Sequence, residues 1–592
     1  MRVRLRCPVS PPEWALLERL LIDTMCRAAR EFVERYCRQD GTLVWRDEWP
    51  GMDGSDDGYE SFANFPLLAS IAGDRDLDSL ARRQWEAVTR QFTGYGQVWR
   101  EFDGYYDWMH HGESSLLLYY LGLTGPAEPR WVGRARRFAA MYTGSDPEAP
   151  NWDPDRRMIR SPINGSRGPR FENSAEDWVT HRPVLAHYPP PFEDLPGAVP
   201  GQPANWNDDA VFAEILRRMN ERMMQGDVPL NLTATSLVAH AYLHTGEPAY
   251  SEWVADYVRA WTERADANGG VLPDNVGPSG QVGECFDGKW WGGYYGWRWP
   301  HGFLNLIQPA LIGAANALLL TGDREHLALP RRLLDAVWGA RRREGGVART
   351  PHRHGDSGWY DFRAPDPQWA IHLWNLSQEP EDAERVETWR GRADPGHVAA
   401  GRGKGDDLHT LPWFAWARDR LPEYPSAILR TNLAEVQRRL DAMRHDDGDP
   451  EQWDVHHWQD LNPVVCEGLV QLTMGAPNAI YHGGLLHARL RTFDHETGWT
   501  GLPQGVGALV SSVDDTGFTL DLVNLDLLRS KRVALHAGLF GEHRFRDVNA
   551  GDGPVPLDGA EPLSVEIGPG CGGQLRLSVD RYANAPSYAW PI

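Results

Sequence analysis

Residues 240–254 read HAYLHTGEPAYSEWV: an apolar helix end, a glycine, a short polar turn and the aromatic start of a second helix. Three other segments share this layout, namely LLASIAGDRDLDSL (67–80), YYLGLTGPAEPRWV (119–132) and ALLLTGDREHLAL (317–329). A glycine after a helix can take the positive φ that ends the helix, and the residues after it then form a tight helix-to-helix turn. The four segments therefore predict helical hairpins in tandem.

Apolar residues between these turns recur every three or four positions, which is the spacing of one buried helix face. The pattern predicts helices at 11–37, 77–92, 130–142, 210–224, 230–244, 250–265, 303–320, 327–342 and 427–443. The intervals between hairpins are irregular, and the connecting segments are long and rich in aromatic residues and glycine. Because a solenoid has a strict short period, we expect the hairpins to close into a ring whose loops build a site at one end.

After residue 484 the pattern changes to alternation of apolar and polar residues, as in GALVSSV, FTLDLVNL, KRVALHAGL, LSVEIG and QLRLSVDRY. This period of two, with turn residues between the segments, predicts a β-sandwich of roughly 100 residues. We therefore expect a mainly α protein, with an (α/α) toroid of helical hairpins at 1–484 and a small antiparallel β-sandwich at 485–592.

This layout resembles the α/α-toroid carbohydrate-active enzymes with a C-terminal β-sandwich. They include uronate lyases, unsaturated glucuronyl hydrolases and inverting glycosidases. The resemblance covers the whole chain in architecture and rests on the hairpin body, its Trp-rich loops and the C-terminal strands, so no catalytic residue is carried over from a named family. It implies an enzyme whose substrate is an oligosaccharide or polysaccharide.

Composition excludes several classes of protein. The 592 residues include 82 Asp and Glu against 60 Lys and Arg, a formal charge of -22, which repels nucleic acid and anionic membranes. No apolar run of about 18 residues occurs, and prolines at 8, 11 and 12 break the start of the chain, so we expect a cytoplasmic protein without signal peptide or membrane span. The six cysteines are far apart, which suits reduced thiols and disfavours a structural zinc site.

The segment ECFDGKWWGGYYGWRWPH (284–301) is the richest candidate site. Its indole rings can stack on sugars and suggest substrate-binding roles for Trp290, Trp291, Trp297 and Trp299. Its ionisable groups are candidate acids, bases or carboxylate-binding groups: Glu284, Asp287, Lys289, Tyr294, Tyr295, Arg298 and His301. The alternative is a packed aromatic turn that plugs the ring.

The segment YYDWMHHGE (105–113) precedes the apolar run SSLLLYYLGL. We expect a helix to begin at Gly112 or Ser114, with His110, His111 and Glu113 at its N-terminus. The helix dipole would lower the pKa of a histidine there and keep it neutral, as a general base requires. The alternative is that His110 only caps the helix and Glu113 pairs with an arginine.

Two further segments place carboxylates next to predicted helix starts. DGSDDGYE (53–60) contains Asp56, Asp57 and Glu60, and NWNDD (205–209) contains Asn205 and Asp208. Carboxylates at helix starts are also ordinary N-caps, so a structural role is equally open.

HRHGDSGWYD (352–361) and EQWDVHHWQD (451–460) gather histidines and aspartates, among them His354 and His457 as candidate sugar-binding residues. They could hold a divalent cation, but there is no HExxH motif and no EF-hand loop. We expect no cofactor, because P-loop and dinucleotide-binding motifs are absent from the sequence as well.

Two reactions fit these residues. In β-elimination of a uronate, a Tyr, His or Lys removes the C5 proton, Arg, His or Asn neutralises the carboxylate, and a Tyr or His protonates the leaving oxygen. Inverting hydrolysis instead needs two carboxyl groups roughly 6.5–9.5 Å apart. Candidates for that pair are Asp56 or Asp57, Glu113, Asp208, Glu284 and Asp287. The abundance of Tyr and His beside Arg favours an exo-acting lyase on short chains, with a sugar epimerase or a non-catalytic carbohydrate-binding protein as further alternatives.

Overall fold

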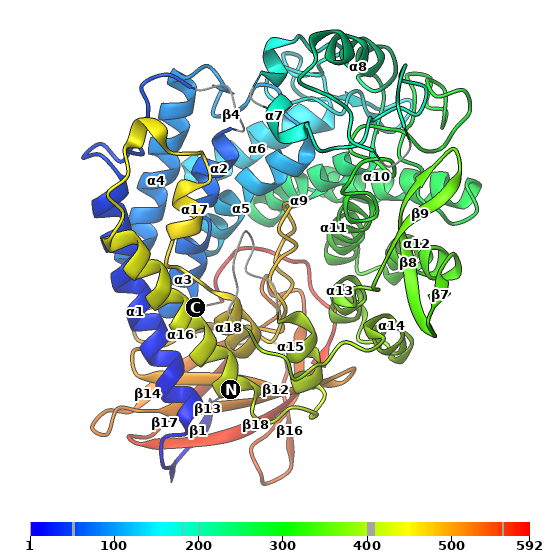
Figure 1. Ribbon diagram of the computed structural model, residues 1–592. Coiled ribbons are helices and arrows are strands. Elements are labelled where there is room, and N and C mark those ends of the chain that lie inside the picture. Colours follow the sequence, from blue (N-terminus) through cyan, green and yellow to red (C-terminus); the bar gives the residue numbers. More distant parts are fainter. Residues whose placement is uncertain are drawn as a thin grey trace.

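A computed structural model describes residues 2–49, 54–179, 181–199, 202–399, 409–558 and 562–591. Helices form the larger part of the regular structure, and most of the longer strands gather at one end of the molecule (Figure 1). The α-helices are α1 (Glu13–Tyr36), α2 (Ser55–Glu60), α3 (Asn64–Ala72), α4 (Arg75–Gly94), α5 (Trp108–Thr124), α6 (Pro129–Thr143), α7 (His181–Leu185), α8 (Asp209–Arg222), α9 (Ala234–Thr245), α10 (Pro248–Ala267), α11 (Leu304–Thr321), α12 (Ala328–Gly339), α13 (Gln368–Ser377), α14 (Pro380–Arg390), α15 (Thr410–Ala417), α16 (Tyr424–Arg444), α17 (His457–Leu461) and α18 (Glu467–Leu469).

The hairpin glycines explain how consecutive helices are joined. Gly73, Gly246 and Gly322 follow α3, α9 and α11 with φ of 72°, 68° and 71°, the left-handed conformation in which a residue without a Cβ is favoured. Gly125, which follows α5, differs because its φ is -145°. Each predicted helical segment contains a helix, although 230–244 begins with a 3-10 turn (Pro229–Thr233) and α12 ends at Gly339.

Helix α11 lies in the core of the helical body. It is the one helix in the described part of the chain that is long and apolar enough to cross a membrane, and 89% of its 18 residues are buried inside the protein. It packs against α9, α10, α12 and α13. Its apolar character therefore matches the requirements of a core helix.

The C-terminal region forms two sheets, at the lower end of the molecule in Figure 1. One has the order β1-β17-β14-β10-β11, and the other the order β12-β13-β18-β15-β16, with β2 paired to β18. Their bounds are β1 (Arg2–Leu5), β2 (Cys7–Pro8), β10 (Leu490–Asp494), β11 (Trp499–Thr500), β12 (Val506–Asp514), β13 (Gly517–Asn524), β14 (Lys531–Ala537), β15 (Arg544–Asn549), β16 (Pro554–Pro556), β17 (Leu563–Ile567) and β18 (Cys571–Asp580). A helical body followed by a β-rich C-terminal region is confirmed. The ring closure and the domain limits at 484 and 485 stay predictions.

Two features of the strands were not expected from the sequence. The N-terminal β1 runs parallel to β17, so the first residues of the chain complete a C-terminal sheet. A three-stranded antiparallel sheet also follows α12, formed by β7 (Arg342–Glu344), β8 (Val347–Gly355) and β9 (Gly358–Arg363). Shorter hairpins join β3 (Val98–Trp99) to β4 (Phe102–Asp103) and β5 (Trp152–Asp153) to β6 (Met158–Ile159).

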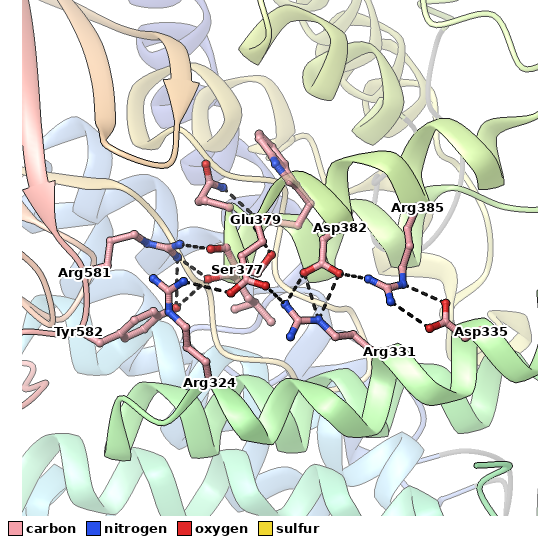
Figure 2. A network of polar contacts seen from close by, with 12 residues as sticks. Arg324, Arg331, Asp335, Ser377, Glu379, Asp382, Arg385, Arg581 and Tyr582 are labelled. Atoms are coloured by element: carbon pink, nitrogen blue, oxygen red, sulfur yellow. Dashed lines mark hydrogen bonds and ion pairs between the residues drawn. The ribbon is translucent and has the colours of Figure 1, made fainter. Parts of the chain in front are cut away.

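A network of ion pairs and hydrogen bonds ties α12, α13 and α14 to the end of β18 (Figure 2). Asp382 is fully buried, and its carboxylate binds Arg331 at 2.6 Å and Arg385 at 2.5 Å. Arg385 also binds the exposed Asp335 at 2.9 Å. On the other side, Arg581 donates to the carbonyl oxygen of Ser377 at 2.6 Å. The network therefore connects the helical body directly to the β-rich region.

We expect the buried and the exposed acids of this network to contribute differently to the free energy of unfolding. Asp382→Ala would leave two guanidinium groups without their buried partner and should lower the free energy of unfolding by about 3–5 kcal/mol. Asp335→Ala removes an acid whose side chain is 57% exposed, so its cost should stay below about 1 kcal/mol. Urea unfolding of both variants measures the difference, and equal losses would contradict this account.

Candidate functional site

A cavity of about 120 Å³ brings together two of the segments singled out in the sequence. His110 comes from the start of α5, and Tyr294 and Tyr295 come from the 284–301 segment. The other lining residues are Trp49, Gln97, Tyr105, Tyr106, Asp107, Ile163, Arg170, Asn173, Asp177, Trp178 and His181. We name it the His110 cavity.

Asp107 fixes the position of His110. It is the N-cap of α5, and its Oδ1 accepts the backbone N–H of Met109 at 2.9 Å. The same carboxylate lies 2.9 Å from Nδ1 of His110, whose ring stacks on Tyr106 at 4.1 Å. Burial raises the pKa of Asp107, but His110 and His111 outweigh this effect, so the pKa lies below its usual value. An ionised Asp107 therefore orients the imidazole, as the carboxylate of a catalytic triad does.

The helix start differs from the sequence prediction. Helix α5 begins at Trp108 rather than at Gly112 or Ser114, so the two histidines and Glu113 lie inside its first turns. His111, fully buried, points to the core, where Nε2 donates to the carbonyl oxygen of Asn164 at 3.0 Å and the ring packs on Phe102. Neighbours on a helix face different directions, and here only His110 lines the cavity.

His301 lies beside the same group of residues. Its ring centroid is 5.7 Å from that of Tyr295. Burial, with smaller contributions from His482 and His110, lowers the pKa of His301 to about 4. Its Nδ1 is buried without a hydrogen-bond partner in the described part of the chain. At neutral pH this imidazole is therefore uncharged and can both accept and donate a proton.

Glu113, one turn after His110, faces a different segment of the chain. Its carboxylate lies 3.2 Å from Nε2 of His482, in the turn before the C-terminal strands. Two glycines allow this contact: a Cβ on Gly112 would lie 2.2 Å from the carbonyl oxygen of His482, and one on Gly483 would lie 2.4 Å from Cα of Gly112. The start of α5 and residues 482–483 are therefore in backbone-to-backbone contact.

Asp57 and Glu60 join this second cluster. The sequence predicted that they precede a helix, but they lie within α2. Gln459 donates to Asp57 at 2.5 Å and to Glu60, and the hydroxyl of Tyr481 donates to Glu60. Burial and the carboxylates of Glu60 and Glu113 hold the pKa of Tyr481 well above its usual value. We call these residues, with Glu113 and His482, the carboxylate cluster.

Other acids of these segments have local roles. Oδ1 of Asp56 accepts the backbone N–H of Gly54 at 2.7 Å, and Asp53 lies outside the described residues. Asp208 caps α8 by accepting the N–H of Ala210 at 2.9 Å. Asp208 and Asn205 are both exposed and line neither the His110 cavity nor the second cavity described below.

The 284–301 segment divides its residues between two cavities. Asp287, Lys289, Trp291 and Arg298 line a second cavity of about 140 Å³ rather than the His110 cavity. Trp297 and Trp299 are buried, and their indole N–H groups donate to the carbonyl oxygens of Leu272 and Gly293.

Two of the remaining predicted residues pack on aromatic rings. His354, in β8, packs against both Trp290 and Trp291, with ring centroids 4.4 and 4.6 Å apart. His457 stacks on Trp453 at 4.1 Å, and its Nε2 lies 2.8 Å from Asp446. His457 lines neither cavity.

A buried carboxylate that the sequence analysis missed holds this segment in place. Asp274 is fully buried and accepts the backbone N–H groups of Gly292, Gly293 and Trp297 at 2.7–3.0 Å. Burial raises its pKa despite these bonds. The surrounding sequence LPDNVG (272–277) carries no catalytic pattern, so nothing in the sequence distinguishes Asp274 from a turn residue.

Sequence reasoning also missed Asp107, Tyr481 and His482 as site residues. The signal for Asp107 was present, because an aspartate before an apolar helix start is a preferred N-cap. The segment IYHGG (480–484) was assigned only to the boundary between the two regions. No group of three or more His, Cys, Asp or Glu residues in the described part of the chain is arranged to hold a metal.

The sequence matches a family model described as a domain of unknown function, DUF8034, over residues 2–349 and 342–470. The chain belongs to this family. No curated protein matches the sequence.

Among solved structures, the chain is similar to a D-mannose isomerase, with 10% identity, a TM-score of 0.37 and coverage of 64% of this chain and 87% of that one. It is also similar to the cellobiose 2-epimerase from Bacillus thermoamylovorans B4167, with 12% identity, a TM-score of 0.21 and coverage of 58% and 94%. A GH127 β-arabinofuranosidase has 11% identity, a TM-score of 0.20 and coverage of 98% and 82%. These neighbours are carbohydrate-processing enzymes, but likenesses this low carry no argument about the reaction.

We expect Gly112→Ala to disrupt the contact between α5 and residues 482–483. The added Cβ meets a backbone oxygen that cannot rotate away, so the free energy of unfolding should fall by about 3 kcal/mol. Gly133→Ala is the matched control, because a Cβ there meets nothing within 4 Å and should stabilise α6 by about 0.5–1 kcal/mol. Similar unfolding midpoints in urea for the two variants would refute the close approach.

We also expect His301 to make the protein less stable in acid. Its pKa of about 4 in the folded protein lies below the unfolded value of 6.5, so the unfolded chain binds the proton more readily. The resulting stability is complete above pH 6.5 and is lost as the pH falls towards 4, by about 1.4 kcal/mol per pH unit. Below pH 6.5 the free energy of unfolding should therefore fall less steeply with pH for His301→Gln than for the wild type. Urea unfolding at several pH values measures both, and a difference between them that does not change with pH would contradict the lowered pKa.

Proposed function

We propose that the protein is an enzyme that removes a proton from a carbon atom beside the carbonyl group of a sugar, with His110 as the general base. The observation that carries this proposal is the place of His110: it lines a small cavity and its ring is oriented by an ionised carboxylate. A carboxylate on Nδ1 stabilises the imidazolium that forms when the ring accepts a proton.

A second group must exchange a proton with the carbonyl oxygen as charge develops there. His301 suits this role because burial keeps it neutral, and a neutral imidazole can donate its N–H and later recover the proton. Tyr294 and Tyr295 line the His110 cavity, and each carries a phenolic hydroxyl group. These three groups and His110 are candidates for an acid and a base on either side of a planar sugar intermediate.

Proton abstraction beside a carbonyl begins two kinds of reaction. Return of the proton gives an isomer or epimer, whereas loss of a leaving group gives β-elimination of a uronate. We favour isomerisation or epimerisation, because the arginines that line the two cavities already bind carboxylates: Arg170 binds Asp177, Arg222 binds Asp194, and Arg298 binds Glu193, each within 2.7–2.8 Å. A substrate uronate would have to compete with these acids.

β-Elimination is the second candidate, favoured by the two tyrosines in the His110 cavity, since a tyrosine can protonate the leaving oxygen. A sugar substrate is supported by the lining of the cavity. Aromatic rings such as Tyr105 and Trp178 offer flat apolar faces, and Gln97 and Asn173 offer amide groups for hydroxyls. The volume of about 120 Å³ suits a small substrate better than a long polymer.

The experiment that tests the proposal is incubation in D₂O with a panel of aldoses, ketoses, neutral disaccharides and uronate oligosaccharides. NMR measures deuterium at the carbon beside the carbonyl, while ultraviolet absorbance and reducing ends are recorded together. We expect deuterium and a new isomer without new reducing ends. New absorbance with new ends would select β-elimination instead, and new ends alone would mean hydrolysis by the carboxylate cluster and refute the proposal.

Variants test the role of His110. His110→Gln should lower the exchange rate by about 10²–10⁴-fold, the usual contribution of a positioned acid or base. His457→Gln is the matched control, because His457 is also bound to a carboxylate at 2.8 Å but lies outside both cavities. Its exchange rate should stay within about twofold of the wild type, far less than the tenfold change that 1.4 kcal/mol in the barrier produces. Equal losses in both variants would exclude His110 as the base.

A further inference from the structure

The second cavity is built differently from the His110 cavity and shares no lining residue with it. It lies between residues 191–194, the 286–298 part of the Trp-rich segment, Arg222 at the end of α8, and the turn between β8 and β9. Its volume is about 140 Å³. None of the proton-transferring groups proposed above faces it.

One wall of this cavity is aromatic. Phe192, Phe286 and Trp291 line it, and the indole N–H of Trp291 donates to Asp356 at 3.3 Å. This hydrogen bond fixes one edge of the partly exposed indole. Flat aromatic faces held in this way are suited to packing against the C–H surface of a sugar ring.

Six of the seven charged residues that line the cavity are matched in pairs, and the seventh, Asp287, is exposed. Glu193 binds Arg298 at 2.7 Å, Asp356 binds Lys289 at 2.8 Å, and Asp194 binds Arg222 at 2.8 Å. An anionic ligand would have to separate one of these pairs to reach a cation, which costs desolvation and a lost partner. A neutral ligand can instead donate hydroxyl groups to the carboxylates without disturbing them.

The backbone shapes the position of Glu193. Both of its oxygens accept the N–H of Asp356 at 2.8 Å, and a Cβ on Gly355 would lie 2.3 Å from Oε1. Burial and the neighbouring Asp356 raise the pKa of Glu193. The turn between β8 and β9 therefore holds this carboxyl group at the cavity through contacts that only a glycine permits.

Arg298 supplies the polar atom that is still unmatched. Its side chain is 7% exposed, and Nε is buried without a hydrogen-bond partner in the described part of the chain. A buried donor without a partner costs free energy, roughly 1–3 kcal/mol for an ordinary polar group.

We propose that this second cavity binds a neutral sugar unit, with Trp291 as the stacking surface and Glu193, Asp356 and Arg298 as partners for its hydroxyl groups. The site is independent of turnover in the His110 cavity. It gives the protein a second, non-catalytic contact with carbohydrate.

Isothermal titration calorimetry tests this with methyl glycosides of neutral hexoses and pentoses, added to the His110→Gln protein so that no turnover occurs. We expect at least one glycoside to bind, and Trp291→Leu in that background to weaken its binding at least about tenfold through loss of the stacking face. Gly355→Ala, which displaces Glu193, should weaken binding as well. This second variant keeps the test valid if Trp291→Leu fails to fold, and circular dichroism checks that both variants are folded.

A matched control tests whether the effect is specific to this site. Trp99→Leu removes an exposed tryptophan that lines neither cavity. It should leave glycoside binding within about twofold, well below a 1.4 kcal/mol change. The proposal is overturned if no glycoside binds at millimolar concentrations, if Trp291→Leu and Gly355→Ala bind as the parent does, or if methyl glucuronide or glucosamine binds more tightly than every neutral glycoside. Because no step depends on turnover, failure here leaves the proton-transfer proposal standing, and the reverse also holds.

Discussion

The candidate site depends on one carboxylate, that of Asp107. As the N-cap it fixes the point where the preceding loop ends and α5 begins, and it also holds the ring of His110 through Nδ1. Once α5 begins there, its geometry brings Glu113 one turn along to His482, and the glycines at 112 and 483 allow the two segments to touch. A single interaction at a helix start thus sets the direction of the base and links it to the carboxylate cluster.

A second buried carboxylate, that of Asp274, holds the Trp-rich 284–301 segment in place through backbone hydrogen bonds. Asp274 is removed from water, and its charge is compensated by three backbone N–H groups of the aromatic segment. With the middle of this segment fixed, Tyr294 and Tyr295 line one cavity, while Trp291 and Arg298 line the other. The segment was expected to be either a site or a structural plug, and it has features of both, because Trp297 and Trp299 are core residues with satisfied N–H groups.

The sequence predicted what depends on local periodicity and little of what depends on contacts between distant segments. Helical spacing and the glycines at 73, 246 and 322 were sufficient for the hairpins, since both act within a few residues. Two of the segments that line the His110 cavity were recognised by composition, but the start of α5 was placed too late because the polar HHGE was read as loop. Tyr481 and His482 could not be found, since Glu60 and Glu113 are more than 360 positions away in the chain.

The protonation of the buried histidines also differs from what the net charge of the chain suggests. A formal charge of -22 should favour protonated histidines, since a negative field stabilises the imidazolium. Yet the pKa of His301, and those of His352 and His354 on β8, fall to about 4, and burial is the largest cause in each case. Desolvation acts at the ring itself, whereas most of the surface acids are distant and screened by salt. An acidic protein can thus keep these buried imidazoles neutral at physiological pH, which is the state that a general base requires.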